Sequence, residues 1–506
     1  MEFDWKLVLV IVVFGLCVGP TIVSYQAYTY RYDDSGYLSN SIKMSRAFWS
    51  GDLHALGKAT WGIHPPIMAS LGLPWGTLSS WDAAGKCFLS LATLTAFFAA
   101  CCLFLMLRSG LKPSYLVIGS VSLIAGLGPF PSGAAAHSVA TSYMADTLFA
   151  WIVFAALLLI PYEMAGDTGT STSDALMHGL LWAVIFSAGA VTKVSFFYFI
   201  VAIIPVLFVI RLRNQGLVNA FAALLSLVIC SFPAIFYWLW LGAFAFRFGW
   251  WSSFGHLAPY FNYPLLPFLG HTFQRSPGLF LSVALILSEL IYLLVKRRDM
   301  KCSTNVLALM ILIGYCIIAL ASSNRKIRFL FSVVIALPFL IGIIVPGRAY
   351  FYSRKAALLA SVFVFCCLVT AALPVLGRAE RTSIERSEAV LAHAIGNNAK
   401  HILLATDSPT LNLNLMQLAI VLSPSRSPIE SATLAWAPLA DLPIEDDFRA
   451  IRESDLIVFQ NKEALDLSSF SNRRVPEYEQ YSQQVGTGPI KLLNDLSVYT
   501  MHHGLQ

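Results

Sequence analysis

Residues 176–211 read LMHGLLWAVIFSAGAVTKVSFFYFIVAIIPVLFVIR, and this stretch decides the fold class. It is almost wholly apolar, and it is too long for one transmembrane helix, because about 20 helical residues cross the roughly 30 Å of bilayer hydrocarbon. Thr192-Lys193, near its middle, is the natural place for a turn. The stretch therefore predicts two consecutive membrane-spanning helices.

The rest of the chain has the same character. Of its 506 residues, 57% are hydrophobic and only 12% are charged, and its mean hydropathy is +0.68. A soluble globular protein carries about twice that charged fraction. We therefore predict an all-α polytopic membrane protein with about eleven transmembrane helices and a small C-terminal α/β domain. The expected spans are 7–25, 84–107, 113–130, 144–162, 177–191, 195–211, 217–239, 278–296, 303–321, 328–346 and 356–376.

The basic residues of the short loops predict the orientation. In an eleven-span arrangement they fall on one side, which the positive-inside rule makes cytoplasmic. The N-terminus is then cytoplasmic, the C-terminus is extracytoplasmic, and 7–25 is a retained helix. The loop 163–176 is an exception, since it holds Glu163 and two aspartates but no basic residue. The net charge of +6 forms no stripe that would bind nucleic acid.

Two domains are expected. Residues 1–376 form the transmembrane domain, with long outer loops at 26–83 and 240–277, and residues 377–506 form an extracytoplasmic α/β domain without cysteine. A helix lying in the membrane interface is expected at Tyr37–Trp49. Within the second domain the pattern predicts strands at 402–405, 456–459 and 497–501 and helices at 411–422 and 445–451.

Two adjacent carboxylates, Asp33 and Asp34, follow the first span. A transferase could use one as the base that takes a proton from an acceptor, and the other to orient the acceptor or a metal ion. Alternatively, they solvate a loop or cap the helix that follows.

Two further outer positions carry the same ambiguity. His64 precedes a double proline and either contacts substrate or simply belongs to a stiff turn. Asp146 opens the fourth span, where it either caps the helix or adds a second acid to the outer site.

Cations also lie at the outer ends of spans. They are Lys193 and the cluster Arg325, Lys326 and Arg328. The positive-inside rule disfavours these positions, so an anionic partner is expected, and a phosphate would serve. The alternatives are snorkelling to headgroups, or pairing with Asp33, Asp34 or Asp146.

Known nucleotide-dependent and hydrolytic motifs are absent from the sequence. It holds no Walker loop, no dinucleotide fingerprint, no H-E-x-x-H and no G-x-S-x-G. An ATP-driven pump or a soluble nucleotide-sugar enzyme is therefore disfavoured.

Taken in order, these landmarks resemble the GT-C superfamily of membrane glycosyltransferases, especially bacterial relatives of protein O-mannosyltransferases and of the lipid A aminoarabinose transferase. The resemblance covers about residues 7–350. Its motifs are Asp33-Asp34-x-x-Tyr37, His64-Pro65-Pro66, Asp146, Thr192-Lys193 and the basic group Arg325, Lys326 and Arg328.

The resemblance implies inverting transfer of a sugar from a polyprenyl-phosphate donor to a glycan, lipid or protein acceptor outside a bacterial plasma membrane. Asp33 takes the place of the catalytic carboxylate; Asp34 departs from the usual glutamate, which leaves its role open. The substrate-binding positions would be Tyr37, His64, Asp146, Lys193, Arg325, Lys326 and Arg328. Some members need a divalent metal and others do not, so no cofactor is assigned.

Two other classes of function compete with this reading. A transporter or flippase of a lipid-linked sugar should hold ionisable residues near the bilayer midplane. Here the middles of the spans are nearly free of charge, with Glu289 as the main exception. A scaffold that only anchors the outer domain would need far fewer spans.

Overall fold

A computed structural model describes a large part of the chain. The described ranges are 32–60, 65–81, 83–109, 145–165, 171–256, 258–261, 264–275, 300–323, 379–408, 410–423, 429–435, 443–461 and 474–501, with positions 291, 295 and 472. The predicted spans 7–25, 113–130, 328–346 and 356–376, and nearly all of 278–296, lie outside these ranges. The count of eleven spans therefore stays a prediction.

The chain divides into two compact units, each considered by itself. The first, here the helical unit, comprises Met1–Tyr25, Thr60–Met68 and Phe88–Val375. The second, here the tail unit, comprises Gln26–Ala59, Ala69–Cys87 and Leu376–Gln506. The tail unit thus includes two stretches of the predicted first outer loop, which were expected to belong to the domain 1–376.

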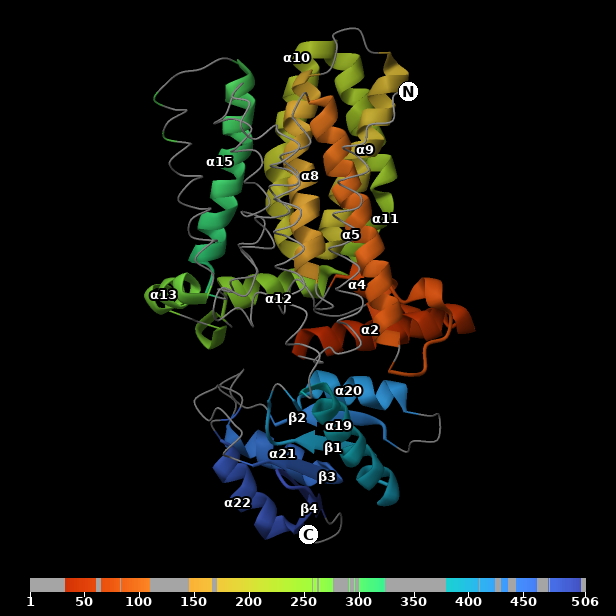
Figure 1. The fold of residues 1–506 in the computed structure, drawn as a ribbon, viewed down its shortest axis with the longest axis vertical. Coiled ribbons are helices and arrows are strands. Elements are labelled where there is room, and N and C mark those ends of the chain that lie inside the picture. The colour runs from red at the N-terminus through yellow and green to blue at the C-terminus, as the bar shows by residue number, and fades with distance from the viewer. Residues whose placement is uncertain are drawn as a thin grey trace, which may run out of the picture. The chain divides into compact units, whose positions relative to one another are not determined.

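Long helices dominate the helical unit, and α8, α9, α10 and α15 run alongside one another (Figure 1). Among the described residues three helical stretches are long and apolar enough to cross a membrane: Leu148–Ala165, Thr172–Thr192 and Val194–Cys230. The elements are α5 (Ala83–Arg108), α8 (Ala145–Ala165), α9 (Thr172–Thr192), η2 (Val194–Phe196), α10 (Phe197–Cys230), α11 (Phe232–Trp240), α12 (Ala243–Ser253), η3 (Ala258–Phe261), α13 (Leu265–Arg275) and α15 (Met300–Ala321).

The predicted turn at Thr192-Lys193 is confirmed. Helix α9 ends at Thr192, and Lys193 adopts an extended conformation with φ −156° and ψ 133°. Its backbone N–H still donates to the carbonyl of Gly189, at 3.1 Å. The short helix η2 then leads into α10, so the apolar stretch folds back on itself.

A second break separates the next two predicted spans, 195–211 and 217–239. Inside α10, Gly216 has a φ of 82°, a left-handed conformation that glycine adopts without steric cost. The part of α10 after this break packs against α9, where the Ser226 hydroxyl donates to the Leu176 carbonyl at 2.8 Å.

The tail unit contains a five-stranded sheet in the order β2-β1-β3-β5-β4. Strand β1 pairs in parallel with β2 and β3, whereas β5 is antiparallel to β3 and β4. All five elements predicted for this domain are confirmed within a few residues. The elements are α19 (Ala379–Gly396), β1 (His401–Leu404), α20 (Leu413–Leu422), β2 (Ser431–Leu434), α21 (Ile444–Glu453), β3 (Leu456–Gln460), α22 (Val475–Val485), β4 (Gly486–Leu493) and β5 (Leu496–Met501).

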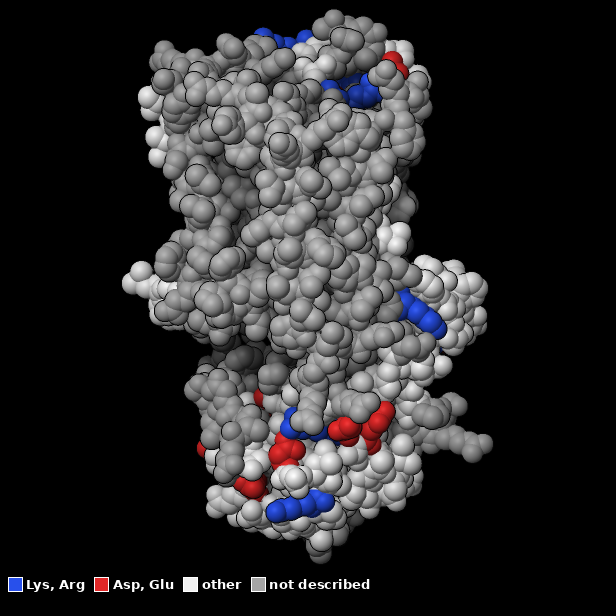
Figure 2. Space-filling model, in the orientation of Figure 1, with Lys and Arg blue, Asp and Glu red and all other residues white. Residues whose placement is uncertain are grey.

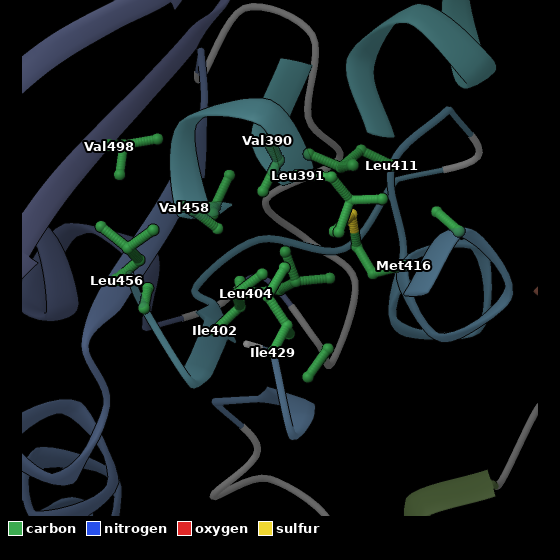
Figure 3. Close-up of a cluster of buried hydrophobic side chains, with 14 of the residues drawn as sticks. Val390, Leu391, Ile402, Leu404, Leu411, Met416, Ile429, Leu456, Val458 and Val498 are labelled. Atoms are coloured by element: carbon green, nitrogen blue, oxygen red, sulfur yellow. The ribbon is translucent and has the colours of Figure 1, made fainter. Parts of the chain in front are cut away.

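The sheet has a hydrophobic core on each face, because alternate side chains of a strand point to opposite faces. Ile402, Leu404 and Val458 lie in the cluster that α19 and α20 cover (Figure 3). Leu403 and Ile457 lie in the opposite cluster, with residues of α21 and α22. Acidic and basic side chains mingle on the visible surface of this domain (Figure 2), as on an ordinary soluble α/β domain.

Two stretches of the segment predicted as the first outer loop pack with this domain in the tail unit. The elements of that segment are α2 (Tyr32–Ser50), α3 (Leu53–Thr60), α4 (Ile67–Ser70) and η1 (Leu73–Trp75). The helix expected at Tyr37–Trp49 is present as α2, and it packs against α20 (Figure 1). Trp81 packs against the core cluster beneath α19, and its indole N–H donates to Glu388 at 3.1 Å.

Candidate functional site

The predicted acidic pair lies in the first turn of a helix, α2. The side chains of Asp33 and Asp34 lie outside the structural description, as do His64, Arg325, Lys326 and Arg328. The structure therefore does not test whether the acidic and basic groups converge on one cavity. Tyr37, one turn further along α2, is buried.

Two predicted site residues do meet, at one end of the helical unit. The Lys193 ammonium donates to the Asp146 carboxylate, in an ion pair that joins the end of α9 to the start of α8. The Asp146 side chain is 3% exposed and that of Lys193 is 17% exposed. Each charge also suits its place, because a helix N-terminus favours an anion and a helix C-terminus favours a cation. The pairing that the sequence left as one alternative for Lys193 is thus present.

An aromatic cluster lies next to the lysine. The ammonium nitrogen lies 5.2 Å from the centroid of the Phe149 ring, within the range of a cation–π contact. Phe149 in turn contacts Phe196 and Tyr315, with ring centroids 6.1 and 6.3 Å away. All three rings are at most 3% exposed. The Lys193 ammonium therefore lies against buried aromatic rings, in surroundings where electrostatic interactions are stronger than in water.

These aromatic residues were not predicted from the sequence. Phe149 lies three residues after Asp146, so helical spacing could have placed the two on one face. Tyr315 gave no such signal, because α15 reaches the site only through tertiary packing. The Tyr198 ring of α10 contacts the Tyr315 ring, and the Tyr198 hydroxyl donates to the Ile311 carbonyl of α15 at 2.9 Å.

A second buried charged cluster joins the opposite ends of the same helices. Glu163 of α8 accepts hydrogen bonds from Arg211 at 2.8 Å and from the Trp182 indole at 3.0 Å. Its Oε1 also lies 2.7 Å from Nδ1 of His178. This cluster accounts for Glu163 of the predicted acidic loop, which lies in the last turn of α8, because Arg211 compensates its carboxylate directly.

The arrangement provides one described cation, Lys193, beside aromatic rings at one end of the helical unit, and an acidic helical turn in the tail unit. The first can stabilise an anionic group at the membrane interface, and the second can accept a proton. Among the described residues, no group of three or more His, Cys, Asp or Glu side chains is placed to hold a metal ion.

Comparison with known proteins gives a fold but no sequence family. No protein-family model matches the sequence, and no curated protein matches it significantly. Among solved structures, ArnT from Cupriavidus metallidurans bound to undecaprenyl phosphate is 13% identical, with a TM-score of 0.59, over 99% of this chain and 98% of that one. Its apo state is 12% identical, with a TM-score of 0.57, over 97% of each chain. The chain has the GT-C fold.

A more distant GT-C enzyme gives the same result. Archaeal oligosaccharyltransferase AglB from Archaeoglobus fulgidus, in complex with an inhibitory peptide and a dolichol-phosphate, is 11% identical with a TM-score of 0.53. The match covers 96% of this chain and 72% of AglB. The GT-C resemblance suggested by the ordered motifs of the sequence is therefore confirmed at the level of the fold. Since three of the described helices are also long and apolar enough to cross a membrane, the chain is an integral membrane protein.

Proposed function

We propose that this GT-C chain is a glycosyltransferase that moves a sugar from a polyprenyl-phosphate donor to an acceptor at the extracytoplasmic face of the membrane, with inversion. The observation that carries the proposal is the acidic pair in the first turn of α2, in a chain whose whole length follows the fold of ArnT. The ArnT and AglB structures contain undecaprenyl phosphate and a dolichol-phosphate, respectively. We extend that class of donor to this chain.

The proposed reaction requires a base and an anion site. Asp33 accepts the proton of the acceptor hydroxyl or amine as that group attacks the anomeric carbon. The bond from this carbon to the phosphate oxygen breaks, and polyprenyl phosphate leaves with the electron pair. Asp34 orients the acceptor, and Tyr37 and His64 contact the substrates.

Cations stabilise the charge that develops on the leaving phosphate. Lys193 is the described member of this set, held in place by Asp146 and the Phe149 ring. Arg325, Lys326 and Arg328 complete the proposed set, with arginine able to grip a phosphate through two parallel hydrogen bonds. No nucleotide site is needed, because the phosphate ester is already activated.

The placement of charge favours an enzyme over a transporter. In the described helices α5, α8, α9 and α15, the Asp, Glu, Lys and Arg residues lie in the terminal turns. In α10 the two arginines lie just before the break at Gly216. A transporter would place such groups near the bilayer midplane. We propose a cytoplasmic N-terminus and an extracytoplasmic tail, in a bacterial plasma membrane.

Sugar transfer by the purified full-length protein tests the proposal. With a set of defined polyprenyl-phosphate sugars, Asp33→Asn should lower the transfer rate roughly 10²-fold or more, because a positioned general base contributes about that factor. Asp52→Asn is the matched control. The exposed Asp52 lies in the same loop and caps α3, where its Oδ1 accepts a hydrogen bond from the Ala55 backbone N–H at 2.9 Å, and asparagine can cap a helix equally well. Repeating the assay with EDTA tests for a divalent metal. Full activity of Asp33→Asn overturns the assignment.

A further inference from the structure

The tail unit holds the helix that carries the acidic pair from two sides. One side of α2 faces α20, and another faces the segment that includes η1. The contacts on the two sides differ in kind, and together they define where the first turn of α2 lies.

On the side of η1, α2 is tied through polar side chains to backbone carbonyls. The Trp49 indole donates to Leu73 at 2.9 Å, and Nε of Arg46 donates to Leu78 at 2.8 Å. Burial lowers the pKa of Arg46, although an arginine stays charged at neutral pH. Gly72 lies so close to α2 that a Cβ there would be 2.5 Å from the backbone oxygen of Ser41. These contacts hold the middle and the C-terminal end of α2.

On the side of α20, the contact lies at the N-terminal end of α2. A Cβ at Gly36 would lie 3.2 Å from Cγ of Asn414 and 3.3 Å from both Nδ2 and Oδ1. The Asn414 amide therefore lies directly against the α2 backbone, two residues after the acidic pair. Residues three apart on an α-helix share a face, so position 33 lies on the face of α2 that Gly36 occupies.

The support beneath Asn414 is rigid. Asn414 is the second residue of α20, and the preceding cap, Asn412, accepts a hydrogen bond from the Leu415 backbone at 3.0 Å. Behind it, Leu415, Met416, Leu418, Ala419 and Leu422 are buried. A side chain at position 36 must therefore displace the Asn414 amide, push α20 against its buried core, or turn the first turn of α2 away.

From these contacts we propose that α20 of the tail positions the acidic turn of α2 for catalysis, with Asn414 as the positioning residue. The proposal rests on the function proposed above. It gives the C-terminal domain a defined task in the reaction, which is to fix the geometry of the base relative to the substrates. Misplacing a catalytic group by about 1 Å can cost roughly 10²-fold in rate.

Graded substitutions at Gly36 in the full-length protein test this. Gly36→Ala should lower kcat roughly threefold and Gly36→Leu roughly a hundredfold, with the KM for the donor little changed, because the base moves while the phosphate site stays. Gly57→Ala and Gly57→Leu are the matched controls, because Gly57 is also helical and a Cβ there meets nothing within 4 Å. Asn414→Ala removes all three crowded atoms, so adding it to Gly36→Ala should restore most of the kcat that Gly36→Ala loses.

Two kinetic outcomes would overturn the positioning role: unchanged kcat in Gly36→Leu, or a Gly36→Ala/Asn414→Ala double variant as slow as Gly36→Ala alone. Amide hydrogen exchange tests the contact between α2 and α20 without an activity assay. Gly36→Leu should accelerate exchange in both α2 and α20 and leave β1 and β3 unchanged; unchanged exchange in α20 also overturns the proposal. If wild-type protein transfers no sugar from any donor, the proposed function fails while the exchange result still reports on the contact.

Discussion

Glu163 and Arg211 form an ion pair at 2.8 Å in which the carboxylate side chain is 2% exposed and the guanidinium side chain is fully buried. Trp182 and His178 also contact the same carboxylate, so one acidic group ties α8, α9 and α10 together. Among the residues that the structure describes, Nε and Nη2 of Arg211 have no hydrogen-bond partner. The positive charge of Arg211 therefore depends on Glu163 as its counter-ion.

Removing one partner of this pair should destabilise the helical unit. Glu163→Gln leaves Arg211 buried without a counter-ion, and breaking such a pair costs roughly 3–5 kcal/mol. Thermal unfolding of the purified protein in detergent measures the loss. Arg213→Met is the control, because Arg213 is exposed on the same helix. Equal stability of Glu163→Gln and wild type would show that the pair contributes nothing.

Lys193 and Asp146 should respond differently to substitution if the lysine also binds donor phosphate. Lys193→Met should weaken donor binding about tenfold, which corresponds to roughly 1.4 kcal/mol. Asp146→Asn keeps a hydrogen-bond acceptor that can hold Lys193 in place but removes the competing negative charge, so donor affinity should be equal or higher. Binding of a polyprenyl-phosphate sugar measures both, with the exposed Lys58→Met as control. Unchanged affinity in Lys193→Met would return the pair to a purely structural role.

Close packing of α9 against α10 should not tolerate a side chain at Gly179. A Cβ there would be 2.2 Å from the backbone oxygen of Ala223 and 2.6 Å from Cβ of Ser226. Gly179→Ala should therefore lower stability by roughly 1–3 kcal/mol, as overpacking does. Gly270→Ala, in helix α13 with nothing within 4 Å, should be neutral or slightly stabilising. A thermal melt that ranks the two variants the other way would contradict the packing.

Asp455 should stabilise the start of β1 in the tail. Its Oδ2 accepts backbone hydrogen bonds from Lys400 at 2.7 Å and His401 at 2.8 Å. Asp455→Ala should lower the local stability of β1 by roughly 2–3 kcal/mol, because hydrogen bonds to a charged group are worth about that much. Amide exchange of β1 measures the effect, against the exposed Glu453→Ala as control. Unchanged exchange in β1 would show that the carboxylate does not secure the strand.

Local sequence was sufficient for features that depend on a few neighbouring residues. Helix length, the turn at Thr192-Lys193 and the buried strands β1 and β3 follow from apolar periodicity and from the charge that interrupts it. The prediction missed β2 and β4. Strand β4 is mostly exposed and β2 is only partly buried, so neither presents the fully apolar run that marked β1 and β3.

By itself, the sequence determined the membrane class and the α/β character of the tail, because these depend on composition and on local spacing. Only the tertiary structure decided which charges meet. Asp146 could have paired with any of the cations predicted at the outer ends of spans, and nothing local joins Trp81 to Glu388, which lie 307 residues apart. Such partners depend on how whole helices pack, since burial of many apolar side chains outweighs the preference of any single charged group.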